Sequence, residues 1–188
     1  MGAARTLIAS GYAASLLPAR LRFLRAAAHP LEAQRTLARR WLARCGGSAY
    51  GRAHGLHRAR DLEALRARAP VVSYPALRPW VKRAAAGEPK VLTEEPILAF
   101  ERTSGSTGGN KLIPLTRSFL REVEAATGPW LFELYARRPG LLGTRAYWSV
   151  SPAARGPERT PGGHRVGLED DTEYFGPIAR RALSALLA

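Results

Sequence analysis

Several kinds of residue are scarce in this 188-residue sequence. It contains a single cysteine, Cys45, and a single methionine. One cysteine cannot form a disulfide within the chain, so we expect a protein of a reducing compartment, the cytoplasm. No apolar run reaches the length of a transmembrane helix, and we expect no membrane span. With 46% hydrophobic and 23% charged residues, the composition predicts a globular fold.

Lysine is scarce as well, although the formal net charge is +14. It occurs only at Lys82, Lys90 and Lys111, so nearly all of the 29 basic residues are arginines, spread along the chain. A basic, non-enzymatic nucleic-acid-binding module is therefore one hypothesis. The arginines are not interleaved with stacking aromatic residues, as single-strand binding would favour. We interpret them instead as the solvated faces of helices, and we expect no nucleic-acid partner.

The local patterns predict an α/β fold in which a helical N-terminal region precedes a mixed sheet with flanking helices. The expected helices cover residues 4–28 with a break at Pro18, 31–44, 61–68, and 74–87 with Ser73 as N-cap. The expected strands cover residues 97–102 and 111–115, and a helix capped by Thr116 follows. Residues 46–61 are expected to form a turn-rich connection. A further strand is expected from Arg145 and a last helix from about Glu173.

The stretch "TSGSTGGNK" at residues 103–111 lies between the two expected strands. Its glycines permit positive φ angles and leave room for a ligand, so that consecutive amides can point into one concavity. Its hydroxyl side chains suit phosphate oxygens, and Lys111 can neutralise their charge. The structural alternative is a flexible hairpin with a solvent-facing lysine. We interpret the stretch as a phosphate-binding loop.

Two familiar phosphate loops do not match this stretch. The Walker pattern requires G-x-x-x-x-G-K-[ST], whereas Asn110 precedes Lys111 and Leu112 follows it. The dinucleotide pattern G-x-G-x-x-G is also absent, because two residues separate Gly105 from Gly108.

The loop resembles the phosphate-binding signature of adenylate-forming enzymes, [ST]-S-G-[ST]-T-G-x-x-K. The longer stretch "FERTSGSTGGNKLIPLT" is similar to the acyl-acid amido synthetases named for the auxin-responsive Gretchen Hagen proteins of plants, in the form of a bacterial-type member. Further similar segments follow in the order that the family keeps: "YGRAHGL", "APVVSYPALRPWVKRAAAGE", "LTEEPI" and "GLEDDTEYF". The resemblance covers residues 34–175.

The resemblance implies a ligase that uses ATP and Mg²⁺ to convert a carboxylic acid into an acyl-adenylate, which an amine, usually an amino acid, then attacks. The small-molecule acid and amine would be its partners. By motif position, the phosphate contacts fall on Thr103, Ser104, Gly105, Ser106, Thr107, Gly108 and Lys111. Thr103 stands where many plant members have serine, and it keeps the hydroxyl group. The resemblance assigns no covalent nucleophile and no metal ligand here.

The resemblance also bears on the extent of the domain. Members of the family are much longer than this chain, and only their first part matches. We therefore expect residues 1–188 to be the N-terminal part of an adenylate-forming domain, ending as a truncated product ends. The residues that hold adenine and ribose and the small closing domain would lie in a missing C-terminal portion. We expect the chain to be inactive without that portion.

Overall fold

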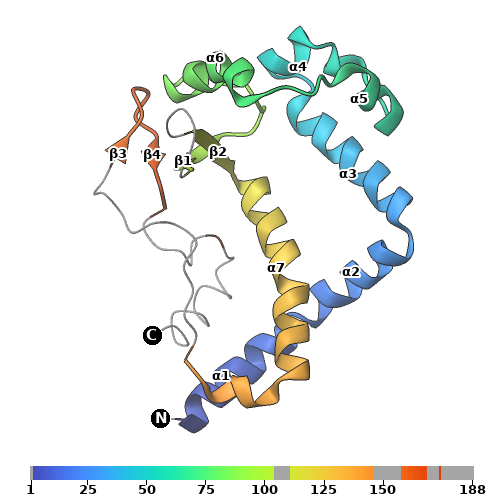
Figure 1. The fold of residues 1–188 in the computed structure, drawn as a ribbon, viewed down its shortest axis with the longest axis vertical. Coiled ribbons are helices and arrows are strands. Elements are labelled where there is room, and N and C mark those ends of the chain that lie inside the picture. The colour runs from blue at the N-terminus through green and yellow to red at the C-terminus, as the bar shows by residue number, and fades with distance from the viewer. Residues whose placement is uncertain (1, 104–110, 146–157, 169–173, 175–188) are drawn as a thin grey trace. The chain divides into compact units, whose positions relative to one another are not determined.

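The computed structural model describes residues 2–103, 111–145, 158–168 and 174. The α-helices are α1 (Gly2–Ser15), α2 (Leu17–Ala28), α3 (Pro30–Cys45), α4 (Ala49–Ala53), α5 (Leu62–Arg68), α6 (Tyr74–Ala85) and α7 (Arg117–Arg137). The 3₁₀-helices are η1 (Leu56–Arg58) and η2 (Pro139–Gly143), and the strands are β1 (Ile97–Arg102), β2 (Leu112–Thr116), β3 (Glu158–Arg159) and β4 (Arg165–Val166) (Figure 1). This mixture of helices with a mixed sheet confirms the predicted α/β class. The strand and helix expected after Arg145 and Glu173 lie outside the described residues.

The chain divides into two compact units. One contains Met1–Ala28, Ser118–Ala153 and Leu168–Ala188, and the other contains His29–Arg117 and Ala154–Gly167. We describe each unit by itself.

The described part of the first unit contains α1, α2, α7 and η2. The chain breaks between α1 and α2 at Leu16, two residues before the predicted position, because Pro18 is accommodated in the first turn of α2. Gly128 of α7 lies close to α2, since a Cβ atom there would stand 3.3 Å from the Cβ atom of Ala19. Helix α7 continues through Gly128 and Pro129 without interruption. Phe119 in its first turn is exposed.

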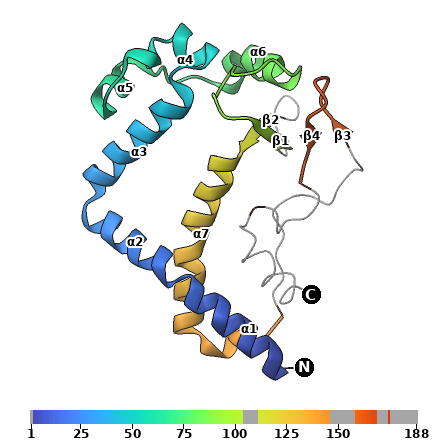
Figure 2. The same cartoon turned by 180° about the vertical axis from the view of Figure 1, so that it is seen from behind.

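The helices of the second unit begin where the sequence carries helix-start signals. Helix α3 starts at Pro30, and α5 starts after Asp61, whose carboxylate accepts a hydrogen bond from the Ala64 amide. The turn-rich connection predicted after α3 contains α4 and η1, a difference that arises because buried Ser48 caps α4. Figure 2 shows α5 beside α3, which it contacts.

The sheet has the strand order β2-β1-β4-β3. Strands β1 and β2 are antiparallel, with the pair Arg102 and Leu112 at the end of the ladder. Strand β4 runs parallel to β1 and antiparallel to β3. The register between β1 and β2 shifts next to Leu98, which is exposed. In this order β2 is an edge strand among the residues that the structure describes.

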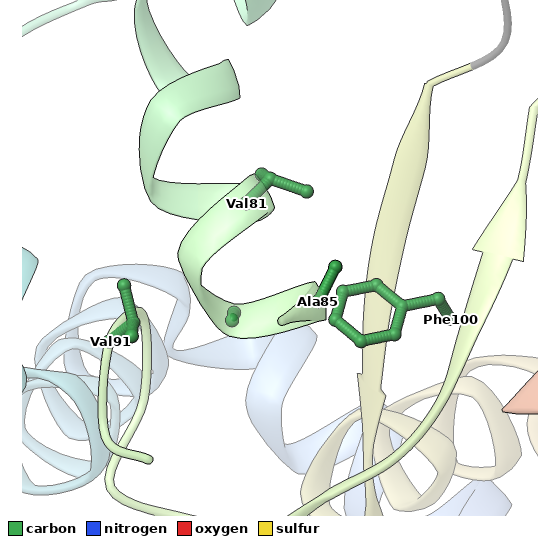
Figure 3. Packing of buried hydrophobic residues seen from close by; sticks show 5 residues of the cluster. Val81, Ala85, Val91 and Phe100 are labelled. Carbon is green, nitrogen blue, oxygen red and sulfur yellow. The ribbon is translucent and has the colours of Figure 1, made fainter. Parts of the chain in front are cut away.

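Helix α6 covers the sheet through an apolar cluster (Figure 3). Its members are Val81, Ala84 and Ala85 of α6, Val91 of the following loop and Phe100 of β1. Phe100 is 0% exposed. Because buried apolar surface is the main stabilising contribution to a fold, this cluster fixes α6 over β1.

The helices in the described part of the chain are too short or too polar to cross a bilayer. Several apolar side chains of α2 and α3 are nevertheless exposed, among them Phe23, Leu31, Leu37 and Trp41. In α3 only Ala38 and Leu42 are buried. The apolar spacing of residues 31–44 therefore predicted the helix, but most of its large apolar residues do not lie in a core.

Candidate functional site

The predicted phosphate loop joins β1 to β2 at one end of the sheet. The ladder pairs Arg102 with Leu112, and the Thr103 amide donates a hydrogen bond of 3.0 Å to the Lys111 carbonyl oxygen just beyond it. The two residues that flank residues 104–110 are thus held together by the strands. This geometry suits a short ligand-binding loop on a rigid support, because the strands fix both of its ends.

The structure describes two of the seven candidate residues. Thr103 and Lys111 are both half-buried and stand at the base of the loop. Ser104, Gly105, Ser106, Thr107 and Gly108 lie outside the described residues. The prediction that a strand precedes the loop and another follows it is confirmed.

Tyr74, the first residue of α6, contacts the base of the loop. The Leu112 amide donates a hydrogen bond of 2.8 Å to the Tyr74 hydroxyl, which lies 3.3 Å from the Leu112 carbonyl oxygen and donates to it. The Lys111 ammonium lies 5.7 Å from the centroid of the Tyr74 ring, within the range of a cation–π interaction. Sequence reasoning missed this residue, because 38 positions separate it from Leu112. The one feature of the sequence that pointed to Tyr74 is its place in "APVVSYPALRPWVKRAAAGE", a segment that resembles the family.

The charges around the loop base differ in how they are compensated. Arg102 forms an ion pair with Glu158 of β3. Arg78 lies 6.0 Å from the Tyr74 ring centroid, a second cation beside that ring. Among the described residues neither Arg78 nor Lys111 pairs with a carboxylate. The base of the loop therefore carries positive charge that an anionic ligand can neutralise.

The chemistry of a metal ion at this site would depend on phosphate ligands. Within the ranges that the structure describes, histidine, cysteine and acidic residues do not gather in groups of three or more. Mg²⁺ in nucleotide sites is commonly held by substrate phosphates together with one or two carboxylates, so a loop that binds phosphate is compatible with it.

The model of the GH3 family N-terminal domain matches residues 19–168, which include the loop, the strands β1 to β4 and Tyr74. The chain belongs to the GH3 family. This assignment confirms the resemblance found in the sequence.

Relatives in rice carry amido synthetase names. The probable indole-3-acetic acid-amido synthetase GH3.2 of Oryza sativa subsp. japonica is 43% identical over 75 residues, which are 39% of this chain and 12% of that protein. The jasmonoyl-L-amino acid synthetase GH3.3 of the same organism is 39% identical over 79 residues, which are 42% of this chain and 17% of that protein. The sequence similarity to these rice proteins is therefore confined to less than half of this chain.

The solved structure of the AtGH3.15 acyl acid amido synthetase in complex with 2,4-DB has the same fold as this GH3 chain. The TM-score is 0.62 at 28% identity, and the match covers 75% of this chain and 24% of that one. The matched segments make up 12 to 22% of the rice proteins. This GH3 chain therefore spans only a minor part of the proteins that it resembles.

Proposed function

We propose that this chain is the N-terminal part of an acyl-acid amido synthetase, a ligase that joins a carboxylic acid to an amine with the use of ATP. The observation that carries the proposal is the match to the GH3 N-terminal domain across the whole loop and both of its strands. The names of the rice proteins and of the solved structure support an acyl acid and an amino acid as substrate classes. We place the reaction in the cytoplasm, where the lone Cys45 stays reduced.

The proposed reaction has two steps. A carboxylate oxygen attacks the α-phosphorus of ATP, and the bond from that phosphorus to the pyrophosphate oxygen breaks. The amine then attacks the acyl carbon, AMP leaves, and the amine loses a proton. In the first step the enzyme must hold a highly charged triphosphate in line with the carboxylate, so positioning and electrostatic stabilisation carry the catalysis.

The loop supplies the groups that this step requires. We assign phosphate contacts to Thr103, Ser104, Gly105, Ser106, Thr107, Gly108 and Lys111. Hydroxyl and amide donors bind phosphate oxygens, and the ammonium of Lys111 compensates their charge. Mg²⁺, when bound to the nucleotide, adds further charge compensation. The hydrogen bond between Thr103 and Lys111 fixes the two ends of this loop on the strands.

Substitutions in the loop test this proposal. In a full-length family member with the same loop, Lys111→Ala should slow carboxylate-dependent ATP–pyrophosphate exchange about ten- to hundredfold, the effect of one lost charge-assisted phosphate contact. Ser106→Ala should act in the same direction, while both variants keep the wild-type unfolding midpoint. The matched control is Lys82→Ala, which removes the same charge from an exposed position of α6. Equal exchange rates in all four proteins would reject the phosphate-binding role.

The extent of the chain leads to a second test. We propose that residues 1–188 form only the N-terminal part of the adenylate-forming domain and that activity requires a C-terminal portion. The chain alone should show no measurable ATP–pyrophosphate exchange, because the reacting groups must be organised around one geometry. Robust exchange by the purified 188-residue chain would overturn this.

We interpret the many arginines behind the charge of +14 as solvated faces of helices and not as a nucleic-acid interface. Arginines of the densest basic runs pair with carboxylates: Arg20 with Glu133 at 2.8 Å, Arg35 with Glu63 at 3.6 Å, and Arg44 with Glu95 at 3.9 Å. These pairs compensate three arginines locally but leave the net charge of +14 unchanged, because that value already counts every carboxylate. Binding to a polynucleotide with a steep dependence on salt concentration would contradict this account.

A further inference from the structure

Tyr74 combines two contacts with consecutive residues at the end of the candidate loop. Its hydroxyl binds both backbone groups of Leu112, and its ring lies below the ammonium of Lys111. Tyr74 itself packs against the apolar cluster that fixes α6 over the sheet. Tyr74 is therefore held in place by the core, and its hydroxyl and ring contact the loop base.

The hydroxyl contact has a clear physical reason. Strand β2 is at the edge of the sheet within the described part of the chain, and an edge strand leaves outward backbone N–H and C=O groups without a strand partner. At Leu112 both groups are satisfied by the one Tyr74 hydroxyl, which accepts from the amide and donates to the carbonyl. The helix thereby fixes the backbone at the first residue after Lys111.

The ring contact restricts the Lys111 side chain. A lysine stem has four carbons and many rotamers, and ordering it on binding a ligand carries an entropic cost. A cation–π contact with a partly exposed ring is a weak interaction, so it can orient the ammonium and still release it to a stronger anionic partner. No carboxylate among the described residues competes for Lys111.

We propose that Tyr74 is a positioning residue for the phosphate loop: it fixes the backbone after Lys111 and orients the Lys111 ammonium toward the bound phosphate. This inference rests on the proposed function of the loop. Tyr74 acts through Lys111 and does not itself contact the reacting atoms.

The scarcity of lysine allows a direct test of the geometry in the 188-residue chain. With isotope-labelled lysine, NMR shows signals from Lys82, Lys90 and Lys111 alone, and the Lys111→Arg variant assigns the third. We expect the ε-methylene signals of Lys111 to be shifted by the aromatic ring. Tyr74→Leu should abolish this shift, whereas Tyr74→Phe should keep it and instead accelerate hydrogen exchange of the Leu112 amide. An unshifted Lys111 signal in the wild type would overturn the inference without touching the proposed function.

A double-mutant cycle tests the role. Titration with Mg²⁺–ATP, followed through the methyl and amide signals of the same chain, gives the affinity even where binding is weak. Tyr74→Leu should weaken binding about three- to tenfold, the size expected for the loss of one cation–π contact and one fixed backbone. In a Lys111→Ala background the same substitution should have a much smaller effect.

Each remaining outcome has a distinct meaning. If the losses from Tyr74→Leu and Lys111→Ala are additive, Tyr74 has only a structural role and the inference is wrong. If Lys111→Ala leaves the ATP affinity unchanged, the proposed role of Lys111 fails, and the role of Tyr74 fails with it. If Tyr74→Phe matches the wild type both in affinity and in Leu112 exchange, the hydroxyl contact has no part in positioning.

Discussion

Gly162 lies so close to Gly87 that a Cβ atom built on Gly162 would stand 2.3 Å from the backbone nitrogen of Gly87. The Gly162 amide also donates a hydrogen bond of 2.8 Å to the carbonyl oxygen of Ala85 at the end of α6. The turn between β3 and β4 is thereby joined to the end of α6, within the same unit that carries the loop. Only glycine permits this approach of two backbones.

The substitution Gly162→Ala should therefore destabilise the chain by about 1–3 kcal/mol, because the colliding atoms belong to the backbone and cannot move aside easily. The free energy of unfolding in urea measures the effect. The matched control is Gly11→Ala in α1, where a Cβ atom meets nothing within 4 Å and alanine favours the helix by about 0.5–1 kcal/mol. Equal stability of Gly162→Ala and the wild type would show that the turn is free to move away from α6.

Two serines at helix starts should respond very differently to replacement by alanine. Ser48 is 0% exposed, accepts a hydrogen bond of 3.0 Å from the Gly51 amide and donates one of 2.6 Å to the Cys45 carbonyl oxygen. Ser73 occupies the N-cap of α6, but its side chain makes no capping hydrogen bond.

Ser48→Ala should lower the free energy of unfolding by about 1–3 kcal/mol, since it removes the hydroxyl partner of the buried Gly51 amide and one of the two hydrogen bonds to the Cys45 carbonyl oxygen. Ser73→Ala should change it by less than about 0.5 kcal/mol, as is usual for exposed sites. Urea unfolding of both variants measures the difference. A larger loss for Ser73→Ala than for Ser48→Ala would contradict the capping geometry.

Local sequence signals were sufficient to locate the elements around the loop. The predicted strand at residues 97–102 coincides with β1, and the helix predicted after Ser73 coincides with α6 to within two residues at its end. Both have short-range causes: an uninterrupted apolar run for the strand, and apolar spacing between a serine and a glycine for the helix. Ser73 shows the limit of such local predictions: it lies at the helix start as predicted, but its side chain does not make the expected capping hydrogen bond.

Contacts between distant parts of the chain could not be predicted in this way. Strands β3 and β4 have two residues each, too few for a periodic pattern, and β4 exists through its parallel pairing with Ala99 and Phe100. Tyr74 reaches Leu112 across 38 positions. Ser48 had the chemistry of a cap, but the surrounding glycines favoured a turn. For β4 and for Tyr74 a distant partner decides the structure, and the local sequence does not indicate that partner; the Ser48 cap has local partners, which its glycine-rich surroundings obscured.

The buried phenol of Tyr12 should make the stability of the helical unit depend on alkaline pH. Tyr12 is 5% exposed, and burial raises its pKa to about 12, with Tyr135 and Glu124 adding to the shift. Between pH 10 and about 12 the unfolded chain loses this proton while the folded chain keeps it. The contribution is therefore complete below pH 10 and is lost as the pH rises toward 12, with a slope of roughly 1.4 kcal/mol per pH unit.

Urea unfolding of the wild type and Tyr12→Phe at several pH values checks this. Other groups titrate in the same range, so the quantity to follow is the difference between the two proteins. We expect a constant difference from pH 7 to 9 and a growing advantage for Tyr12→Phe above pH 10. A difference that stays constant up to pH 12 would mean that Tyr12 ionises equally in both states.

The single thiol offers a check on the packing at the end of α3. Burial raises the pKa of Cys45 above its ordinary value, against a smaller lowering by the hydrogen bond with Thr93. The thiolate is the reactive form, so near pH 8 the folded chain should react with an aromatic disulfide reagent more slowly than the urea-unfolded chain.

The pH dependence of this reaction gives a second measurement. Raising the pH should accelerate the reaction of the folded chain, and the midpoint of the rate increase should lie at a higher pH than for a free thiol. Thr93→Val should shift that midpoint further upward, because it removes the interaction that favours the thiolate. Thr36→Val, at a partly exposed position of α3, should leave the midpoint unchanged. A midpoint below the ordinary thiol value in the wild type would show that the lowering effects of Thr93 and Arg44, and not burial, control this site.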